Sequence, residues 1–183
     1  MIGWIILGAV VLLLIIIFAS YYNRFIVLGN RIDNSLSQIN VQLKRRAGLI
    51  PNLIQTVKGF AKHEKEAIKA VTDARKALMG AKGVEKKVKA DNQLESALKT
   101  IFAIAEGSPD LKANTNFLEL QRELSSTEDK VAYARQFYND SILTYNNMTQ
   151  QFPANIFAKI YNKKSREYLK IAEVDKKLPE VKF

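Results

Sequence analysis

The pattern of hydrophobic and polar positions changes once along this chain, near residue 23. The first 23 residues, MIGWIILGAVVLLLIIIFASYYN, contain no charged side chain, and Arg24 is the first charged residue. As a helix, this apolar run would span about 30 Å, the thickness of one bilayer hydrocarbon core. Trp4 lies near one end of the run, and Tyr21 and Tyr22 lie at the other, as in the aromatic belts of membrane proteins. The pattern predicts a transmembrane anchor over residues 1–22.

A cleaved signal peptide is the competing interpretation of this run. It is less favoured because no basic residue precedes the run, the run exceeds a usual signal core, and FAS is a poor cleavage sequence. Basic residues such as Arg24 and Arg31 follow the run. The positive-inside rule then places the C-terminal part in the cytoplasm. We expect a single-pass protein of the cell membrane with a cytoplasmic C-terminal domain.

From Arg24 onward, apolar residues recur at steps of three and four, the period of one helix face. The first stripe consists of Phe25, Leu28, Ile32, Leu36, Ile39, Leu43, Ala47, Ile50, Ile54 and Val57. It crosses Gly48 and Pro51 without losing phase, whereas a helical hairpin would usually reset the phase with polar turn residues. The stripe therefore predicts one long helix that is kinked at Gly48 and Pro51 and continues to about Met79.

The predicted kink has a direct chemical cause. Pro51 has no N–H to donate to the carbonyl of Ala47, and its ring pushes on that carbonyl, while Gly48 offers slack. The kink would either let the helix follow a curved bundle or act as a hinge between a membrane-proximal stalk and a distal bundle. We favour the first interpretation, because proline bends helices wherever it lies inside one.

A second helix should follow the two glycines in MGAKGVEKK. Its apolar face is made of Leu94, Leu98, Ile101 and Ala105. The segment EGSPDLKANT should stop this helix, because it contains Gly107 and Pro109.

A third, long helix should begin near Asn114 or Thr115 and end before Pro153. Its apolar positions alternate steps of three and four over about five heptads, the signature of a coiled coil. These positions are Phe117, Leu120, Leu124, Thr127, Val131, Ala134, Tyr138, Ser141, Tyr145, Met148 and Phe152. A short helix in NIFAKIYNKK and a charged tail complete the chain.

The predicted fold is all-α. A transmembrane helix continues into the long kinked helix, and the helices form an antiparallel bundle of about four, because each stripe needs a partner to bury it. We divide the chain into an anchor at residues 1–22, a helical bundle with heptad-like helices at 23–151, and a short amphipathic helix with a charged tail at 152–183.

Two stretches carry a family resemblance. The sequences NRIDNSLSQINVQLKRRAGLIPNLIQTVKGFAKHE and YNNMTQQFPANIFAKI resemble the LemA family of bacterial membrane proteins. The resemblance covers most of the chain and implies one N-terminal span with an α-helical bundle, but no known reaction. It also implies two settings: relatives in membrane-shaping or organelle-forming systems, and relatives encoded beside a membrane zinc protease. Gly48 departs from the family, in which an acidic residue is common there.

The sequence offers no constellation for catalysis. It has no cysteine and one histidine, His63, which lacks the second histidine that a helical metal site needs. Gly-rich phosphate-binding motifs are missing as well. We therefore predict no catalytic, cofactor-binding or metal-binding residues and a protein that is not an enzyme.

Charge indicates an acidic partner. The chain has 28 Lys+Arg against 18 Asp+Glu, a formal charge of +10. Lys58, Lys62, Lys65 and Lys69 share one face of the predicted long helix, so they would dock to an acidic surface or form an ordinary solvated face. Nucleic acid is not expected, because these lysines have no interleaved aromatic residues and the chain is tied to a membrane.

The first predicted helix also raises the question of what covers it. At 1.5 Å per residue, residues 22–80 would reach about 90 Å, against about 36 Å and about 50 Å for the two later helices. Leu36, Ile39 and Leu43 would then lack cover in their own chain, with Arg45 and Arg46 following them. Neighbouring copies would be the simplest cover, which predicts a homo-oligomer through these residues.

The C-terminal element has a strong apolar face that includes Phe157 and Tyr161. Packing on the bundle is the first interpretation, and partial insertion into a membrane interface is the alternative, helped by nearby basic residues such as Lys159.

Two functions from different classes fit these features. One is a non-enzymatic scaffold that self-associates at the bilayer, with membrane shaping or organisation as its process. The alternative is an accessory subunit that docks to another membrane protein, such as a membrane zinc protease. A purified scaffold should form large assemblies, whereas an adaptor should stay small until its partner is added.

Overall fold

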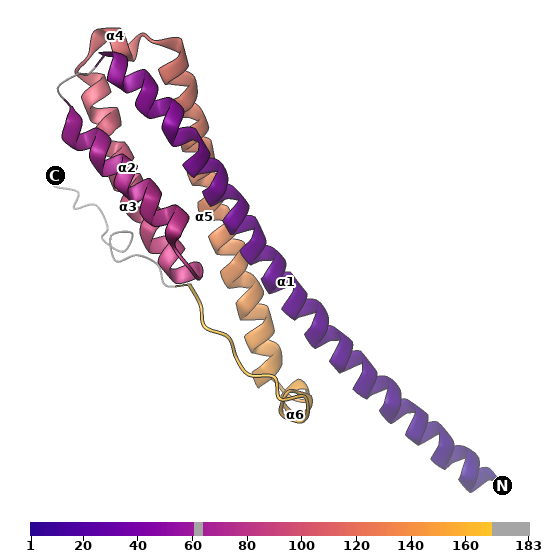
Figure 1. Cartoon of the computed structure of the whole chain (residues 1–183). Coiled ribbons are helices and arrows are strands. Elements are labelled where there is room, and N and C mark those ends of the chain that lie inside the picture. Colours follow the sequence, from indigo (N-terminus) through magenta and orange to yellow (C-terminus); the bar gives the residue numbers. More distant parts are fainter. Residues whose placement is uncertain (61–63, 170–183) are drawn as a thin grey trace, which may run out of the picture. The chain divides into compact units, whose positions relative to one another are not determined.

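The structure is a computed structural model of the chain, and it describes residues 1–60 and 64–169. Figure 1 shows helices joined by short connections, and these described residues contain no strand, which confirms the all-α prediction. The helices are α1 (Ile2–Phe60), α2 (Lys65–Gly80), α3 (Val84–Glu106), α4 (Pro109–Lys112), α5 (Thr115–Gln150) and α6 (Ala154–Ile160). The helices α1 and α5 pack antiparallel, as do α2 and α3.

The chain divides into two compact units that share α1 and α5. The anchor unit comprises Met1–Ser37 and Gln136–Tyr168, and the bundle unit comprises the described residues of Gln38–Arg135 together with Leu169.

The anchor unit begins with the apolar segment of α1. This segment is long and apolar enough to cross a membrane, and no part of its most apolar window is buried by the chain. Beyond it, α1 packs on α5: Phe25 meets Tyr145 at a ring distance of 6.0 Å, and the hydroxyls of Ser35 and Ser141 lie 3.3 Å apart. The cation of Arg31 also lies over the ring of Phe137.

The bundle unit buries the apolar stripes that periodicity predicts. The stripe of α1 supplies Ile39, Leu43, Ala47, Ile50, Leu53 and Val57 to the core. Facing them from α3 and α5 are Leu94, Leu98, Ile101, Ala105, Phe117, Leu124, Val131 and Ala134, which are all buried. Ile54 is half-buried, so Leu53 fills the core where the stripe had Ile54.

The prediction that the first helix continues to about Met79 is wrong. It ends at Phe60, and α2 is a separate helix that runs back along the bundle (Figure 1). Charge explains the division, because Lys58 lies in the last turn of α1 and Glu66 in the first turn of α2. Each charge opposes the partial charge of its helix end, and Gly59 weakens the helix just before the break.

Helix α1 is continuous across Pro51, as the uninterrupted stripe predicted. Every residue from Ala47 to Thr56 is helical, so no hairpin forms there. The carbonyl of Ala47, which has no donor at residue 51, accepts a bond from Nε of Arg75 in α2 at 2.8 Å. The side chain of another helix thus replaces the missing backbone donor, while a bend at Gly48 stays a prediction.

The predicted ends of the later helices are confirmed. Gly107 follows the last residue of α3, and Pro109 occupies the first turn of the short α4, where its missing N–H costs nothing. The side chain of Asn114 caps α5 by accepting a bond from the backbone N–H of Phe117 at 3.0 Å. Helix α5 ends at Gln150, and Phe152 is 81% exposed. The prediction that Phe152 is the last residue of the heptad stripe is therefore wrong.

Candidate interaction surfaces

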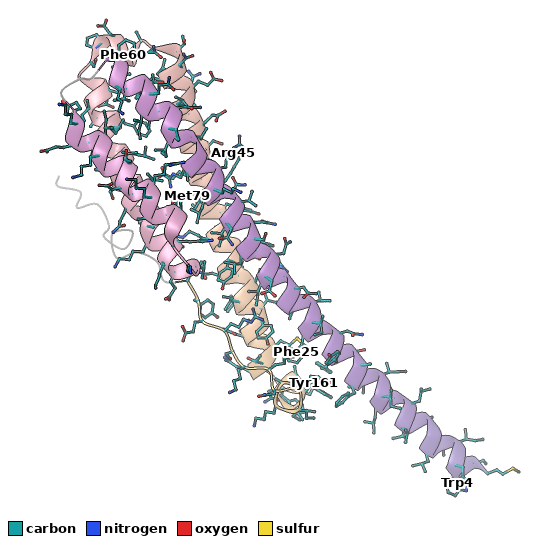
Figure 2. The ribbon with its side chains drawn as sticks, viewed as in Figure 1. Trp4, Phe25, Arg45, Phe60, Met79 and Tyr161 are labelled. Carbon is teal, nitrogen blue, oxygen red and sulfur yellow. The ribbon has the colours of Figure 1, made fainter. Side chains whose placement is uncertain are left out.

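Aromatic rings gather in the anchor unit where the apolar segment of α1 ends. We name this group the aromatic collar, and it consists of Phe18, Tyr21, Tyr22, Phe25, Phe157 and Tyr161. Phe157 stacks on Tyr21 at 4.4 Å, and Tyr161 meets Phe18 edge to face at 4.9 Å. Figure 2 labels Phe25 and Tyr161, which lie side by side with a ring distance of 6.2 Å.

The local sequence of α6 explains how two of these rings reach α1. Phe157 and Tyr161 are four residues apart, so they share a helix face, and Ala154 and Ala158 on that face are small and buried. The phenol of Tyr161 donates to the carbonyl of Phe18 at 2.7 Å, which attaches α6 to the apolar segment itself.

Arg166 attaches the extended segment after α6 to the same unit through hydrogen bonds and an ion pair. The backbone N–H of Arg166 donates to Oδ1 of Asn146, and Nδ2 of Asn146 donates to the carbonyl of Arg166, both at 2.8 Å. The guanidinium of Arg166 reaches Asp33 of α1 at 3.2 Å and lies over the ring of Tyr145. These contacts connect the C-terminal segment to both α1 and α5.

The core of the bundle unit holds a buried ion cluster. Arg46 is 1% exposed, and its guanidinium donates to Asp91 of α3 at 3.0 Å and to Glu128 of α5 at 3.1 Å. The side chain of Asp91 is 3% exposed, whereas that of Glu128 is 43% exposed. Arg46 therefore joins three helices, and its close contact with Asp91 is the desolvated one.

Burial is the main cause of the raised pKa of both carboxyl groups, Asp91 and Glu128. Loss of hydration raises the pKa of Asp91 above 3.8, although the neighbouring charge of Arg46 opposes the shift. The pKa of Glu128 is raised above 4.5, first by burial and then by the negative charge of Glu95. The attraction between the charges in the cluster holds the three helices together, while the loss of hydration of those charges opposes it, as is usual for buried ion pairs.

A basic groove opens between α1 and α2 in the bundle unit. Its volume is about 630 Å³, and its walls are formed by Lys58, Lys65, Ile68, Lys69, Thr72, Asp73 and Lys76. The four lysines are exposed and face a single carboxylate in these walls. The groove therefore has the charge to attract an acidic segment.

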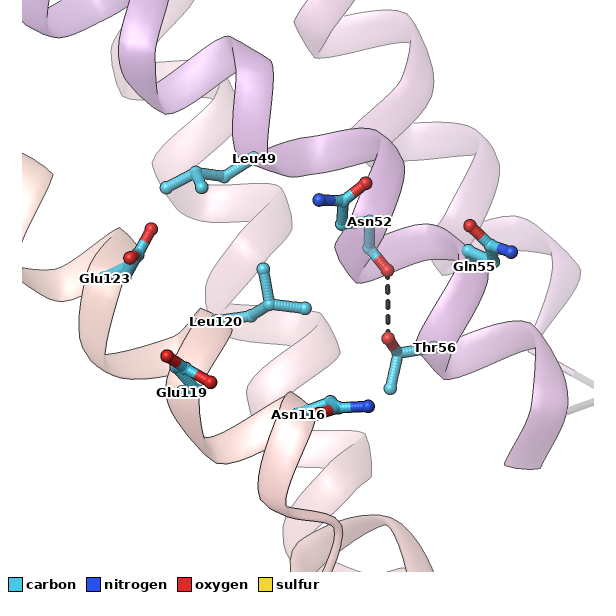
Figure 3. A pocket seen from close by; sticks show the side chains of 8 residues that line it. All are labelled: Leu49, Asn52, Gln55, Thr56, Asn116, Glu119, Leu120 and Glu123. Atoms are coloured by element: carbon cyan, nitrogen blue, oxygen red, sulfur yellow. Dashed lines mark hydrogen bonds between the residues drawn. The ribbon is translucent and has the colours of Figure 1, made fainter.

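A second groove in the bundle unit lies between α1 and α5 (Figure 3) and has a volume of about 520 Å³. Leu49 and Leu120 form its apolar part, while Glu119 and Glu123 project from α5 toward it. The remaining walls are mostly amides, so this groove suits polar contacts. Among the described residues, no group of three or more metal-ligating side chains exists.

The structure places the predicted interaction residues in different environments. Ile39 and Leu43 are buried and Leu36 is half-buried, so the premise that they lack cover in their own chain is wrong. In the bundle unit, Leu43 lines a hollow together with Leu78 and Met79 of α2 and Lys87 of α3, so these helices supply part of its cover. Arg45 is exposed, as expected of a surface residue, whereas Arg46 is buried in the ion cluster.

The predicted lysine face is divided between two helices. Lys58 belongs to α1, and Lys65 and Lys69 belong to α2, yet all three line the basic groove. Lys62 and His63 lie outside the described residues.

Sequence reasoning missed Asp91, Glu128 and Arg75 as partners. A signal for the ion cluster existed, because Arg46 lies three residues after Leu43 and four before Ile50 and is thus in phase with the apolar stripe. Asp91 likewise precedes Leu94 by three residues. Charged residues in phase with two apolar stripes indicate a buried pair.

Comparison with known proteins identifies a family and several similar proteins. A family model described as LemA family matches residues 35–183. Protein LemA of Metamycoplasma hominis is 27% identical over 151 residues, which cover 80% of this chain and 68% of that protein. Magnetosome protein MamQ of Magnetospirillum gryphiswaldense is 25% identical over 173 residues, 80% of this chain and 64% of that protein. Magnetosome protein MamQ 2 of Paramagnetospirillum magneticum is 24% identical with the same coverage. The chain thus spans slightly less than two thirds of the MamQ proteins.

Proposed function

Because the chain belongs to the LemA family, whose model matches residues 35–183, we propose that it is a non-enzymatic membrane-anchored helical scaffold that self-associates at the bilayer. The observation that carries the proposal is the uncovered apolar segment of α1 beside helices that bury their own stripes. A contiguous apolar surface of this size calls for lipid as its cover. The role in membrane organisation is in keeping with relatives that are named as magnetosome proteins.

The proposed orientation places the bundle unit in the cytoplasm. Arg24, Arg31 and Arg45 are exposed and follow the apolar segment. The positive-inside rule favours this topology for a short flanking sequence.

Self-association would use exposed side chains rather than the buried stripe of α1. In the bundle unit, large apolar side chains remain exposed at Val41, Phe60, Met79 and Tyr133. Tyr133 is 70% exposed on α5, and tethering to one membrane raises the local concentration of such surfaces.

The test measures the mass of the full chain in detergent, with electron micrographs of the same sample. We expect large assemblies that become smaller when Tyr133→Glu is combined with Val41→Glu. Circular dichroism checks that the double variant keeps its helices, and Lys130→Glu on exposed α5 surface serves as the matched control. A wild-type chain that is monomeric at every concentration overturns self-association.

A second candidate function is an adaptor, and the basic groove favours it. Four lysines from two helices converge there on a cleft of about 630 Å³. An acidic segment of another membrane protein is the partner that this charge would attract, and its binding should weaken as salt screens the lysines.

A labelled peptide of glutamates tests this candidate with the full chain in detergent. Fluorescence anisotropy should report salt-dependent binding that Lys65→Glu with Lys69→Glu removes. The matched control is Lys86→Glu with Lys89→Glu, which reverses two exposed lysines of α3 outside the groove. Equal loss in both double variants would mean that net charge alone attracts the peptide, and the groove would then have no specific role.

A further inference from the structure

Helix α6 has two apolar faces, and its own chain covers only one of them. The inner face carries Ala154, Ala158 and the collar residues Phe157 and Tyr161, which pack toward α1. A helix that is apolar on opposite faces is normally buried on both, so the second face calls for a partner.

The outer face is distinctly exposed. Ile156 and Ile160 are four residues apart on this helix and are 49% and 58% exposed. Phe152, just before the helix, is 81% exposed. Lys159 of the same helix and Lys164, four residues after Ile160, are also exposed.

The contacts of α6 fix its level along the anchor. The phenol of Tyr161 donates to the carbonyl of Phe18, a residue inside the apolar segment, and Phe157 stacks on Tyr21 at its end. Tyr22 also meets the ring of Tyr161 at 5.3 Å. Tyrosines at the end of a spanning segment lie at the headgroup level, so α6 is held at that same level.

We propose that α6 is an interfacial helix that inserts Phe152, Ile156 and Ile160 into the boundary between lipid headgroups and acyl chains. The occupant of its outer face is the lipid bilayer, and Lys159 and Lys164 lie where anionic headgroups would contact them. The inference rests on the proposed membrane anchor. Its consequence is a second attachment to the bilayer, which fixes the rotation of α1 about its own axis.

The continuity of α6 with the anchor is what selects lipid over other occupants. The inner face already touches the segment that lipid surrounds, and insertion of an interfacial helix reaches only about 5–10 Å into the boundary. Basic residues beside the apolar side chains match the negative surface of the cytoplasmic leaflet, which the predicted topology places on this side.

Single cysteines test the inference, because the natural sequence contains none. Ile160→Cys and Ile156→Cys in the full chain are labelled with an environment-sensitive fluorophore and reconstituted into vesicles of phosphatidylcholine with phosphatidylglycerol. Bromine on the acyl chains then quenches only labels that enter the lipid. Leu13→Cys reports the anchor, and Lys130→Cys reports an exposed residue outside the collar.

We expect both α6 labels to be quenched most by lipid brominated near the headgroup, Leu13→Cys to be quenched most by deeply brominated lipid, and Lys130→Cys to stay unquenched. If only Leu13→Cys is quenched and iodide in the water reaches the α6 labels, the anchor stands and the inference fails. Labels shielded from both iodide and lipid bromine would mean that protein covers the outer face, which also overturns it. If Leu13→Cys itself is unquenched, the anchor fails.

Discussion

Pro51 deprives the buried carbonyl of Ala47 of its helical donor, and Arg75 supplies a replacement from α2. Ala47 is 1% exposed, and Nε of Arg75 donates to its carbonyl at 2.8 Å. We predict that Arg75→Met destabilises the chain strongly when residue 51 is proline and only weakly when residue 51 can donate. The perturbation is therefore a double-mutant cycle between Arg75 and Pro51.

The magnitude follows from the burial of the acceptor. Arg75→Met keeps much of the aliphatic stem but leaves the Ala47 carbonyl unpaired, which should cost about 1–3 kcal/mol of unfolding free energy. In the Pro51→Ala background the N–H of residue 51 can reach that carbonyl, so the same change should cost less than about 1 kcal/mol. The coupling energy should then be about 1–2 kcal/mol.

Pro51→Ala alone should stabilise the chain by clearly less than the ~3 kcal/mol that an interior proline costs in an unprepared helix. The reason is that Arg75 already satisfies the carbonyl that proline leaves free. Relief of ring pressure on the Ala47 carbonyl is the remaining gain.

Urea unfolding of the full chain in detergent, followed by far-ultraviolet circular dichroism, measures all four members of the cycle. Lys76→Met is the matched control, because Lys76 is the exposed neighbour of Arg75 and should change stability by less than about 0.5 kcal/mol. Equal costs of Arg75→Met in both backgrounds would refute the reasoning, since Arg75 would then act independently of the proline.

Other predictions concern the ion cluster, the core and the topology. Arg46→Met should cost about 3–5 kcal/mol in the same unfolding assay because it leaves Asp91 buried without its cation, whereas the exposed Arg45→Met should be nearly neutral. The raised pKa of Asp91 means that the folded state holds its proton more tightly than the unfolded state, so unfolding free energy relative to Asp91→Asn should fall as pH rises above 3.8 through the folded pKa. Leu43→Asp should unfold the bundle unit rather than only change the mass of an assembly, because Leu43 is 3% exposed. A C-terminal tag should resist protease added outside intact cells.

Each of these predictions has a contrary result. If Arg46→Met lowered the unfolding free energy only slightly, the inference that Arg46 neutralises a buried carboxylate would be wrong. If the unfolding free energies of the wild type and of Asp91→Asn changed identically with pH, burial would not raise the pKa of Asp91. If Leu43→Asp stayed folded but formed smaller assemblies, the apolar stripe of α1 would be an interface between copies, as the sequence predicted. A tag cleaved from outside would reverse the topology.

Local sequence signals predicted much of the fold because they depend on neighbours in the chain. The apolar run before Arg24, the phase of the α1 stripe across Pro51 and the stop at Gly107 are readable from composition and spacing alone. The cap at Asn114 is local as well, since its side chain bonds the third residue after it. Burial then follows wherever a stripe has a partner.

The candidate interaction surfaces were only partly predictable. The lysines at 58, 65 and 69 were identified from their sequence spacing, but the spacing suggested one continuous helix face and the structure brings them together from two helices. For α6, periodicity indicated one apolar face and left its cover open. The structure assigns Phe157 and Tyr161 to α1 and leaves Ile156 and Ile160 exposed.

The sequence by itself determined most of the helical stretches, their apolar faces and the uncharged N-terminal run, because these properties repeat along the local chain. Only the tertiary structure decided which helix covers which face. Arg46 meets Asp91 across 45 positions and Arg75 meets Ala47 across 28, distances at which a helical period carries no information about partners. Those pairings depend on the separation of α1 and α2 after Phe60, which a continuous 3.6-residue pattern does not reveal. They decide whether a basic side chain is exposed or buried.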